Sequence, residues 1–152
     1  MTRQIPRQYW KYYNAENLAD FYISNAWTQA RKTDAFYGDT LHTIIMEQYQ
    51  EAEGAITKLD DIRNQVLIES LGTMVSGGLE TKIATDENDI ISDEQLLAFA
   101  HPTTQQQYKE QKLITERLIQ IYSILRDHYT TFFDMYEQAI HNLEAAQNSS
   151  SF

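Results

Sequence analysis

Hydrophobic residues recur with a helical repeat over the last third of the chain. Their spacing alternates between four and three residues, which is typical of helices that pack lengthwise through a heptad seam. Thr103 and Thr104 are each followed three residues later by a glutamine, as in a helix capping box. We therefore predict a long helix over residues 104–147 and a flexible tail over 148–152. The seam positions are Leu118, Tyr122, Leu125, Tyr129, Phe132, Tyr136, Ala139 and Leu143.

A second long helix is predicted over residues 34–76. Either Thr33 or Asp34 is a candidate cap, and Gly77 with Gly78 gives a stop signal. Gly54 lies inside this helix at a cost of about 1 kcal/mol relative to alanine, which a close helix contact would explain. The apolar face holds Leu41, Ile45, Ala52, Ala55, Ile56, Leu59, Ile62 and Val66.

Two shorter helices complete the predicted fold, one over residues 15–32 and one over 92–100, where Pro102 follows as a terminator. Residues 79–90 are predicted to form an irregular connector, with a short hairpin as the alternative. Two long helices joined by a compact connector favour an antiparallel hairpin. We predict an all-α fold, an elongated helical bundle forming a single domain over 15–147, preceded by an arm over 1–14.

Composition narrows the possible functions. The chain has 152 residues and no cysteine, which excludes disulfides, thiolate catalysis and cysteine-bound metals. No apolar run has the length of a signal peptide or a membrane span, so we expect a cytoplasmic protein without membrane insertion. The net charge is −10, although residues 1–32 carry a net charge of +3. The residues after position 32 are therefore strongly acidic, and their negative charge disfavours binding to nucleic acid.

Candidate metal ligands do not converge in the sequence. Asp127, Asp134 and His141 are seven residues apart and therefore share a helix stripe on the side opposite the heptad seam. A symmetric hairpin would bring His42 to the height of residues 139–142 and thus near His141. Both histidines would then point away from the seam. The acidic stretch that starts at Asp86 lacks the glycine and the final carboxylate of a calcium loop. We therefore expect no metal site and no cofactor.

No catalytic residues are expected either. The sequence has no Gly-x-Ser-x-Gly elbow, no phosphate-binding Gly-x-x-x-x-Gly-Lys loop and no Gly-x-Gly-x-x-Gly turn. Scattered histidines and carboxylates do not by themselves form an active site.

The arm combines basic and aromatic residues, with Arg3, Arg7 and Lys11 interleaved among apolar ones. Three interpretations are open: packing on its own bundle, docking on another chain, or stacking on single-stranded nucleic acid. The last is the weakest on an acidic protein. Pro6 predicts that residues 1–7 are extended. The candidate partner-binding residues are Ile5, Arg7, Tyr9, Trp10, Tyr12 and Tyr13.

The seam itself is a second candidate surface. Tyr122, Tyr129 and Tyr136 carry hydroxyls that need partners when buried, whereas a closed seam more often uses leucine or isoleucine. These tyrosines and Phe132 form either the core of the bundle or a stripe that docks a partner.

These patterns favour a non-enzymatic protein–protein interaction module, such as a self-assembling structural component, an adaptor or a chaperone-like bundle. Self-assembly through exchanged arms would give a ring or a filament. The alternative is an acidic inhibitor or immunity protein that blocks the basic surface of a toxin or nuclease, and a metal-binding bundle ranks third. Ionic strength separates the first two, because electrostatic inhibition weakens with salt and apolar assembly does not.

Overall fold

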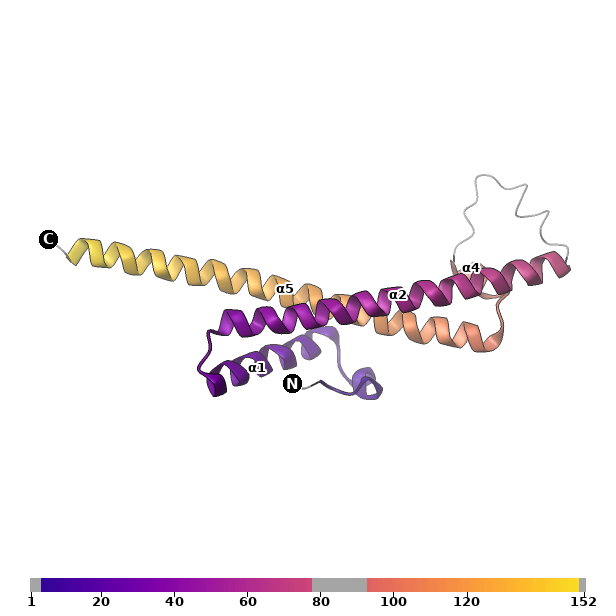
Figure 1. Ribbon diagram of the computed structural model, residues 1–152, viewed down its shortest axis with the longest axis horizontal. Coiled ribbons are helices and arrows are strands. Elements are labelled where there is room, and N and C mark those ends of the chain that lie inside the picture. The colour runs from indigo at the N-terminus through magenta and orange to yellow at the C-terminus, as the bar shows by residue number, and fades with distance from the viewer. Residues whose placement is uncertain (1–3, 78–92, 151–152) are drawn as a thin grey trace. The chain divides into compact units, whose positions relative to one another are not determined.

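The computed structural model describes residues 4–77 and 93–150, so the predicted connector over 79–90 and its alternative hairpin lie outside the described residues. The elements are a 3-10 helix η1 (Arg7–Tyr12) and the helices α1 (Ala15–Thr33), α2 (Tyr37–Gly77), α4 (Asp93–Leu97) and α5 (Pro102–Ser150) (Figure 1). Helices α1, α2 and α5 alone comprise 109 of the 152 residues. The two long helices, α2 and α5, pack against each other, which confirms the predicted all-α fold.

The chain divides into two compact units. Unit 1 comprises residues 1–51 and 117–152, and unit 2 comprises residues 52–116. Helices α2 and α5 contribute to both units, whereas α1 belongs to unit 1 and α4 to unit 2. The single domain predicted over residues 15–147 stays a prediction.

Unit 1 has a core formed by α1, α2 and α5. Helix α1 buries three alanines, at positions 19, 26 and 30, which allow a close approach between helices. Larger side chains fill the remaining space, and several of them are fully buried. The core residues are Leu18, Tyr22, Leu41, Ile44, Ile45, Leu118, Ile121 and Leu125.

The connection between α1 and α2 begins with Asp34, the residue that caps the end of α1. Asp34 has φ 52° and ψ 40°, a left-handed conformation in which its N–H donates to the Ala30 carbonyl. This conformation is typical of the residue that follows a helix. Asp34 therefore closes α1, and the prediction that it starts α2 is wrong. The Phe36 carbonyl instead accepts from the N–H of Asp39 at 3.1 Å in the first turn of α2.

The register between α2 and α5 within unit 1 differs from that of a symmetric hairpin. The ring of Tyr49 lies 5.5 Å from that of Tyr122, and the ring of His42 lies 5.8 Å from that of Tyr129. His42 thus lies more than one heptad from the height predicted for it, near residues 139–142. As a consequence, α5 continues past the beginning of α2 (Figure 1).

In unit 2, α4 and the turn after it contact α2 through the side chains of Ser70 and Thr73. The Ser70 hydroxyl donates to the Leu96 carbonyl at 2.7 Å, and the Thr73 hydroxyl donates to the Phe99 carbonyl at 3.0 Å. Helix α4 ends at Leu97 rather than at residue 100.

A carboxylate from α2 caps the start of α5. Glu69 accepts hydrogen bonds from the N–H of His101 at 2.8 Å and from the Thr104 hydroxyl at 2.8 Å. The helix begins at Pro102, a residue suited to the first helical position because it has no N–H to satisfy. The predicted capping boxes at Thr103 and Thr104 are therefore wrong, since the Thr104 hydroxyl donates to Glu69.

Replacing Glu69 with alanine is expected to lower the melting temperature at neutral pH. Hydrogen bonds from the Gln65 side chain, the His101 N–H and Thr104 hold the pKa of Glu69 below its ordinary value. A lowered pKa stabilises the fold at pH values above the ordinary carboxyl pKa, and this contribution is lost as the pH falls through the lowered value. Thermal melts across an acidic pH series will therefore show the Glu69→Ala difference shrinking with acidification.

The matched control is Glu53→Ala, an exposed glutamate on the same helix. We expect it to change the melting temperature little at any pH. Equal shifts from both variants would contradict a capping role for Glu69.

Two buried polar side chains in unit 2 contact the middle of α2. The hydroxyl of Thr115 lies 3.2 Å from the Ala55 carbonyl, to which it donates, and the Gln111 amide donates to Thr115 at 3.2 Å. The neighbouring Gly54 has no atom within 4 Å of where a Cβ would lie. The prediction that a close helix contact explains Gly54 is therefore wrong.

Candidate interaction surface

The arm packs on its own unit through the side chain of Trp10. Residues 7–12 form the 3-10 helix η1, so the extended part ends at Pro6. Trp10 is 8% exposed, and its indole N–H donates to the Ile5 carbonyl at 3.0 Å. The Arg7 guanidinium lies 5.5 Å from the Trp10 ring and 3.7 Å from the Glu51 carboxylate. Trp10 is therefore a packing residue of unit 1.

The tyrosines of the arm point outward. Tyr9, Tyr12 and Tyr13 are all exposed. The backbone next to them is fixed, because the Arg117 guanidinium donates to the Tyr13 carbonyl at 2.6 Å. Their role in partner binding stays a prediction.

The seam of α5 is most buried in its first part and exposed towards the C-terminus. Leu118 and Leu125 are fully buried, and Tyr122, Tyr129 and Phe132 are half-buried. Tyr136 is already exposed. The heptad pattern therefore marks two surfaces, a closed seam up to Leu125 and an open stripe after Phe132.

An aromatic cluster joins the start of α2 to the point where the seam opens. The Phe36 ring lies 5.1 Å from the Tyr136 ring, and the Tyr37 ring lies 5.0 Å from the Phe132 ring. Gly38 leaves the space for this packing, since a Cβ there would lie 2.6 Å from the Phe36 ring and 3.1 Å from the Phe133 ring.

His128 lies at the edge of this cluster. Its Nε2 lies 3.0 Å from the Tyr37 hydroxyl, at hydrogen-bond distance. Burial raises the pKa of Tyr37 above its ordinary value. The Tyr37 ring also stacks on the Trp27 ring, with ring centroids 4.1 Å apart. His128 thus has a structural partner.

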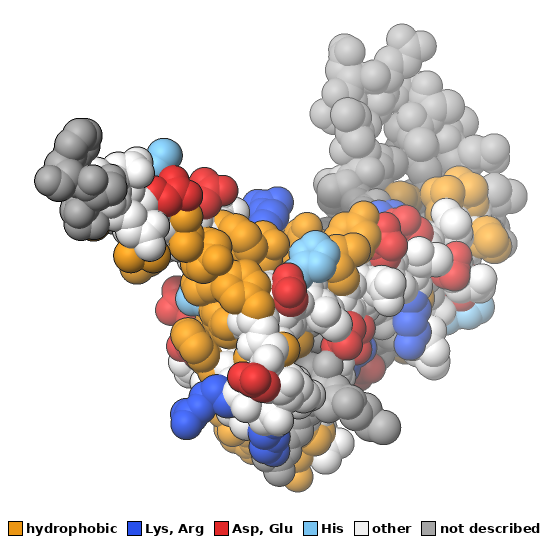
Figure 2. Space-filling model, turned by 60° about the vertical axis from the view of Figure 1, so that its left-hand side comes forward, with side chains coloured by type: hydrophobic (Ala, Val, Ile, Leu, Met, Phe, Trp, Pro, Cys, Tyr) orange, Lys and Arg blue, Asp and Glu red, His pale blue; other side chains and the backbone are white. Residues whose placement is uncertain are grey.

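Every residue from 134 to 149 is exposed, and we call this segment the α5 tail. Large apolar side chains are exposed on it, namely Met135 (69%), Tyr136 (41%), Ile140 (39%) and Leu143 (56%). Figure 2 shows hydrophobic side chains gathered along this projecting end of unit 1. The seam pattern identified Tyr136 and Leu143. Ile140 and Phe133 were missed, although both directly follow a seam position.

The acidic residues of the tail occupy its opposite side. Asp134, Glu137 and Glu144 are the charged groups, and the tail contains no lysine or arginine. His141 lies on the same side. Within residues 4–77 and 93–150, no group of three or more histidines, cysteines or carboxylates is placed to hold a metal ion.

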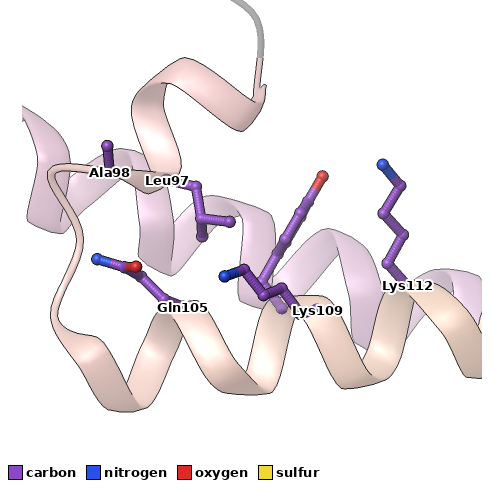
Figure 3. A pocket seen from close by; sticks show the side chains of 6 residues that line it. Leu97, Ala98, Gln105, Lys109 and Lys112 are labelled. Atoms are coloured by element: carbon purple, nitrogen blue, oxygen red, sulfur yellow. The ribbon is translucent and has the colours of Figure 1, made fainter.

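Unit 2 carries a shallow hollow of about 340 Å³ between α4 and α5 (Figure 3). Lys109 and Lys112 lie on one side of it, with Leu97 and Ala98 opposite. Gln105 and Tyr108 complete the lining, so no carboxylate or histidine among the described residues lines it. The hollow offers positive charge without an acid–base pair, and surface lysines alone do not define an anion site.

No family model, curated protein or solved structure matches this chain. Across the described ranges, no helix has both the length and the apolar composition that a bilayer-spanning segment needs. The geometry of the side chains therefore carries the functional argument.

Proposed function

We propose that the protein is a non-enzymatic protein–protein interaction module whose binding surface is the apolar stripe of the α5 tail. The observation that carries this proposal is the exposure of Met135, Ile140 and Leu143 on the α5 tail, where Tyr136 is also 41% exposed although its ring packs on Phe36. Contiguous exposed apolar surface on a folded protein marks an interaction site. The aromatic cluster extends the surface, since tyrosine and phenylalanine are favoured interface anchors.

The alternative is an acidic inhibitor that covers a basic surface of another protein. Its support is the net charge of −10 and the three carboxylates on the far side of the tail. In that case the acidic side would bind and the apolar stripe would stay open. The two proposals therefore assign opposite faces of one helix to the partner.

Affinity capture from the native cell with mass spectrometry tests both proposals. Three baits are needed: the wild type, Leu143→Glu on the apolar stripe, and Glu144→Gln on the acidic side. If the proposal holds, Leu143→Glu loses the captured protein, Glu144→Gln retains it, and high salt does not release it. Loss with Glu144→Gln and release by salt would favour the inhibitor. Equal capture by all three baits would rule out the tail as the surface.

A further inference from the structure

We infer that the α5 tail binds a second copy of itself, as an antiparallel pair of helices related by a two-fold axis at the height of residue 141. This inference rests on the proposed function and names the partner of its surface. Its evidence is the order of large, small, charged and uncharged residues along the tail.

The exposed stripe continues the heptad of the buried seam. If Leu118 is taken as a d position, Ala139 and Ala146 are also d positions. Tyr136 and Leu143 then occupy a positions. The stripe is therefore an alternation of large and small side chains. A partner of complementary shape must present small residues opposite the large ones.

The tail itself provides such a partner when its direction is reversed. In an antiparallel pair each a layer packs against a d layer of the other helix. A two-fold axis at residue 141 places Tyr136 opposite Ala146 of the second copy, and Ala139 opposite Leu143. All four layers then combine one large and one small residue, as close packing requires. A parallel pair would place Tyr136 opposite Tyr136 of the second copy, which crowds that layer. It would also place Ala139 opposite Ala139, which leaves that layer underpacked.

The charges of the tail also permit self-pairing. Residues at the e and g positions flank a helical interface, and their charges set partner choice. In the tail these positions hold Met135, Ile140, Asn142, Gln147 and Ser149, none of which is charged. The carboxylates at 134, 137 and 144 lie at the outer b and f positions. Like charges therefore do not meet across the interface, and their remaining repulsion falls as salt rises.

The tail is short, so the pairing is expected to be reversible. Its 16 exposed residues span about 24 Å at the rise of an α-helix. An interface of this length is small compared with those of permanent dimers. We expect a monomer–dimer equilibrium in the micromolar range, which is unchanged or strengthened by salt.

Sedimentation velocity over a concentration series measures this equilibrium in the full chain. Ile140→Glu puts a charge on the stripe, and His141→Glu puts the same charge on the next residue, on the outer side. We expect Ile140→Glu to weaken dimerisation by more than about tenfold and His141→Glu to change it by less than about threefold. Both residues are exposed, and matching circular dichroism spectra will show that both variants fold. A wild type that stays monomeric across the series overturns the inference.

Single cysteines test the direction of pairing, because the natural chain contains none. Asn142→Cys places two thiols side by side across the proposed axis. Met135→Cys places them about 20 Å apart along the axis, from the rise per residue. A short thiol-reactive crosslinker should therefore join two copies of the Asn142→Cys variant and not of Met135→Cys. Equal crosslinking of both would show a parallel pair and overturn the antiparallel arrangement.

These results are separable from the test of the proposed function. In one outcome, the protein stays monomeric while the Leu143→Glu bait no longer captures a partner of another sequence. That result would support the interaction module and contradict the pairing of two copies. If the protein stays monomeric and capture does not depend on the tail, both fall.

Discussion

Replacing Leu125 with alanine is expected to lower the free energy of unfolding by about 3 kcal/mol, as for other fully buried leucines. Leu125 is 0% exposed in unit 1, where α5 is covered by its neighbours. The loss combines the transfer free energy of the removed methyl groups with the cavity that a close-packed core leaves behind. Urea unfolding of the purified protein measures this change.

The matched control is the same substitution at Leu143, which continues the same heptad seam but is 56% exposed. There we expect a change of less than about 0.5 kcal/mol. The comparison should be made at a concentration low enough to keep the protein monomeric. Similar losses at both positions would mean that the α5 tail is covered within the same chain, which would contradict its exposure.

Replacing Gln48 with methionine is expected to stabilise the fold by about 1–2 kcal/mol. Gln48 is fully buried on α2, and neither atom of its amide has a partner with hydrogen-bond geometry among the described residues, although the amide lies close enough to Tyr22 to lower the pKa of that side chain. An unpaired polar group retains the desolvation cost of burial without the compensating bond. Methionine has a similar length and flexibility and carries no such cost.

Tyr22 lies next to Gln48. Burial is the main cause that raises the pKa of Tyr22 to about 12, the nearby Glu51 carboxylate adds to it, and the Gln48 side chain lowers it. Gln50→Met, at an exposed position two residues along α2, is the control and should change stability by less than about 0.5 kcal/mol. If Gln48→Met destabilises the protein in thermal or urea unfolding, the amide has a partner that contributes to stability.

Local patterns were enough to predict the four described α-helices of this fold but not the 3-10 helix η1. The spacing from Leu118 to Leu143 predicted α5, and the apolar face from Leu41 to Val66 predicted α2. Both patterns are long, and periodicity over many turns is the strongest signal that a sequence carries. The same heptad also identified Tyr136 and Leu143 in the exposed stripe.

The register between the two long helices could not be predicted, because it depends on contacts between distant residues. Glu69 caps α5 through His101, which lies 32 residues later in the chain. Ser70 fixes α4 through the Leu96 carbonyl. Neither contact has a sequence signature. A heptad shows that a helix face is apolar, but not how far along it a covering helix extends.

The continuity of α5 has a consequence for the energetics of its tail. An isolated helix of this length is marginal in water, because its first turn is costly to form. The tail grows from turns that are already packed, so it needs only propagation. Its helical content then depends on residue propensities as well as on contacts. Ala145 lies on the outer side, and a glycine there would cost about 1 kcal/mol of helix stability. The affinity of the surface is thus adjustable by residues that touch no partner.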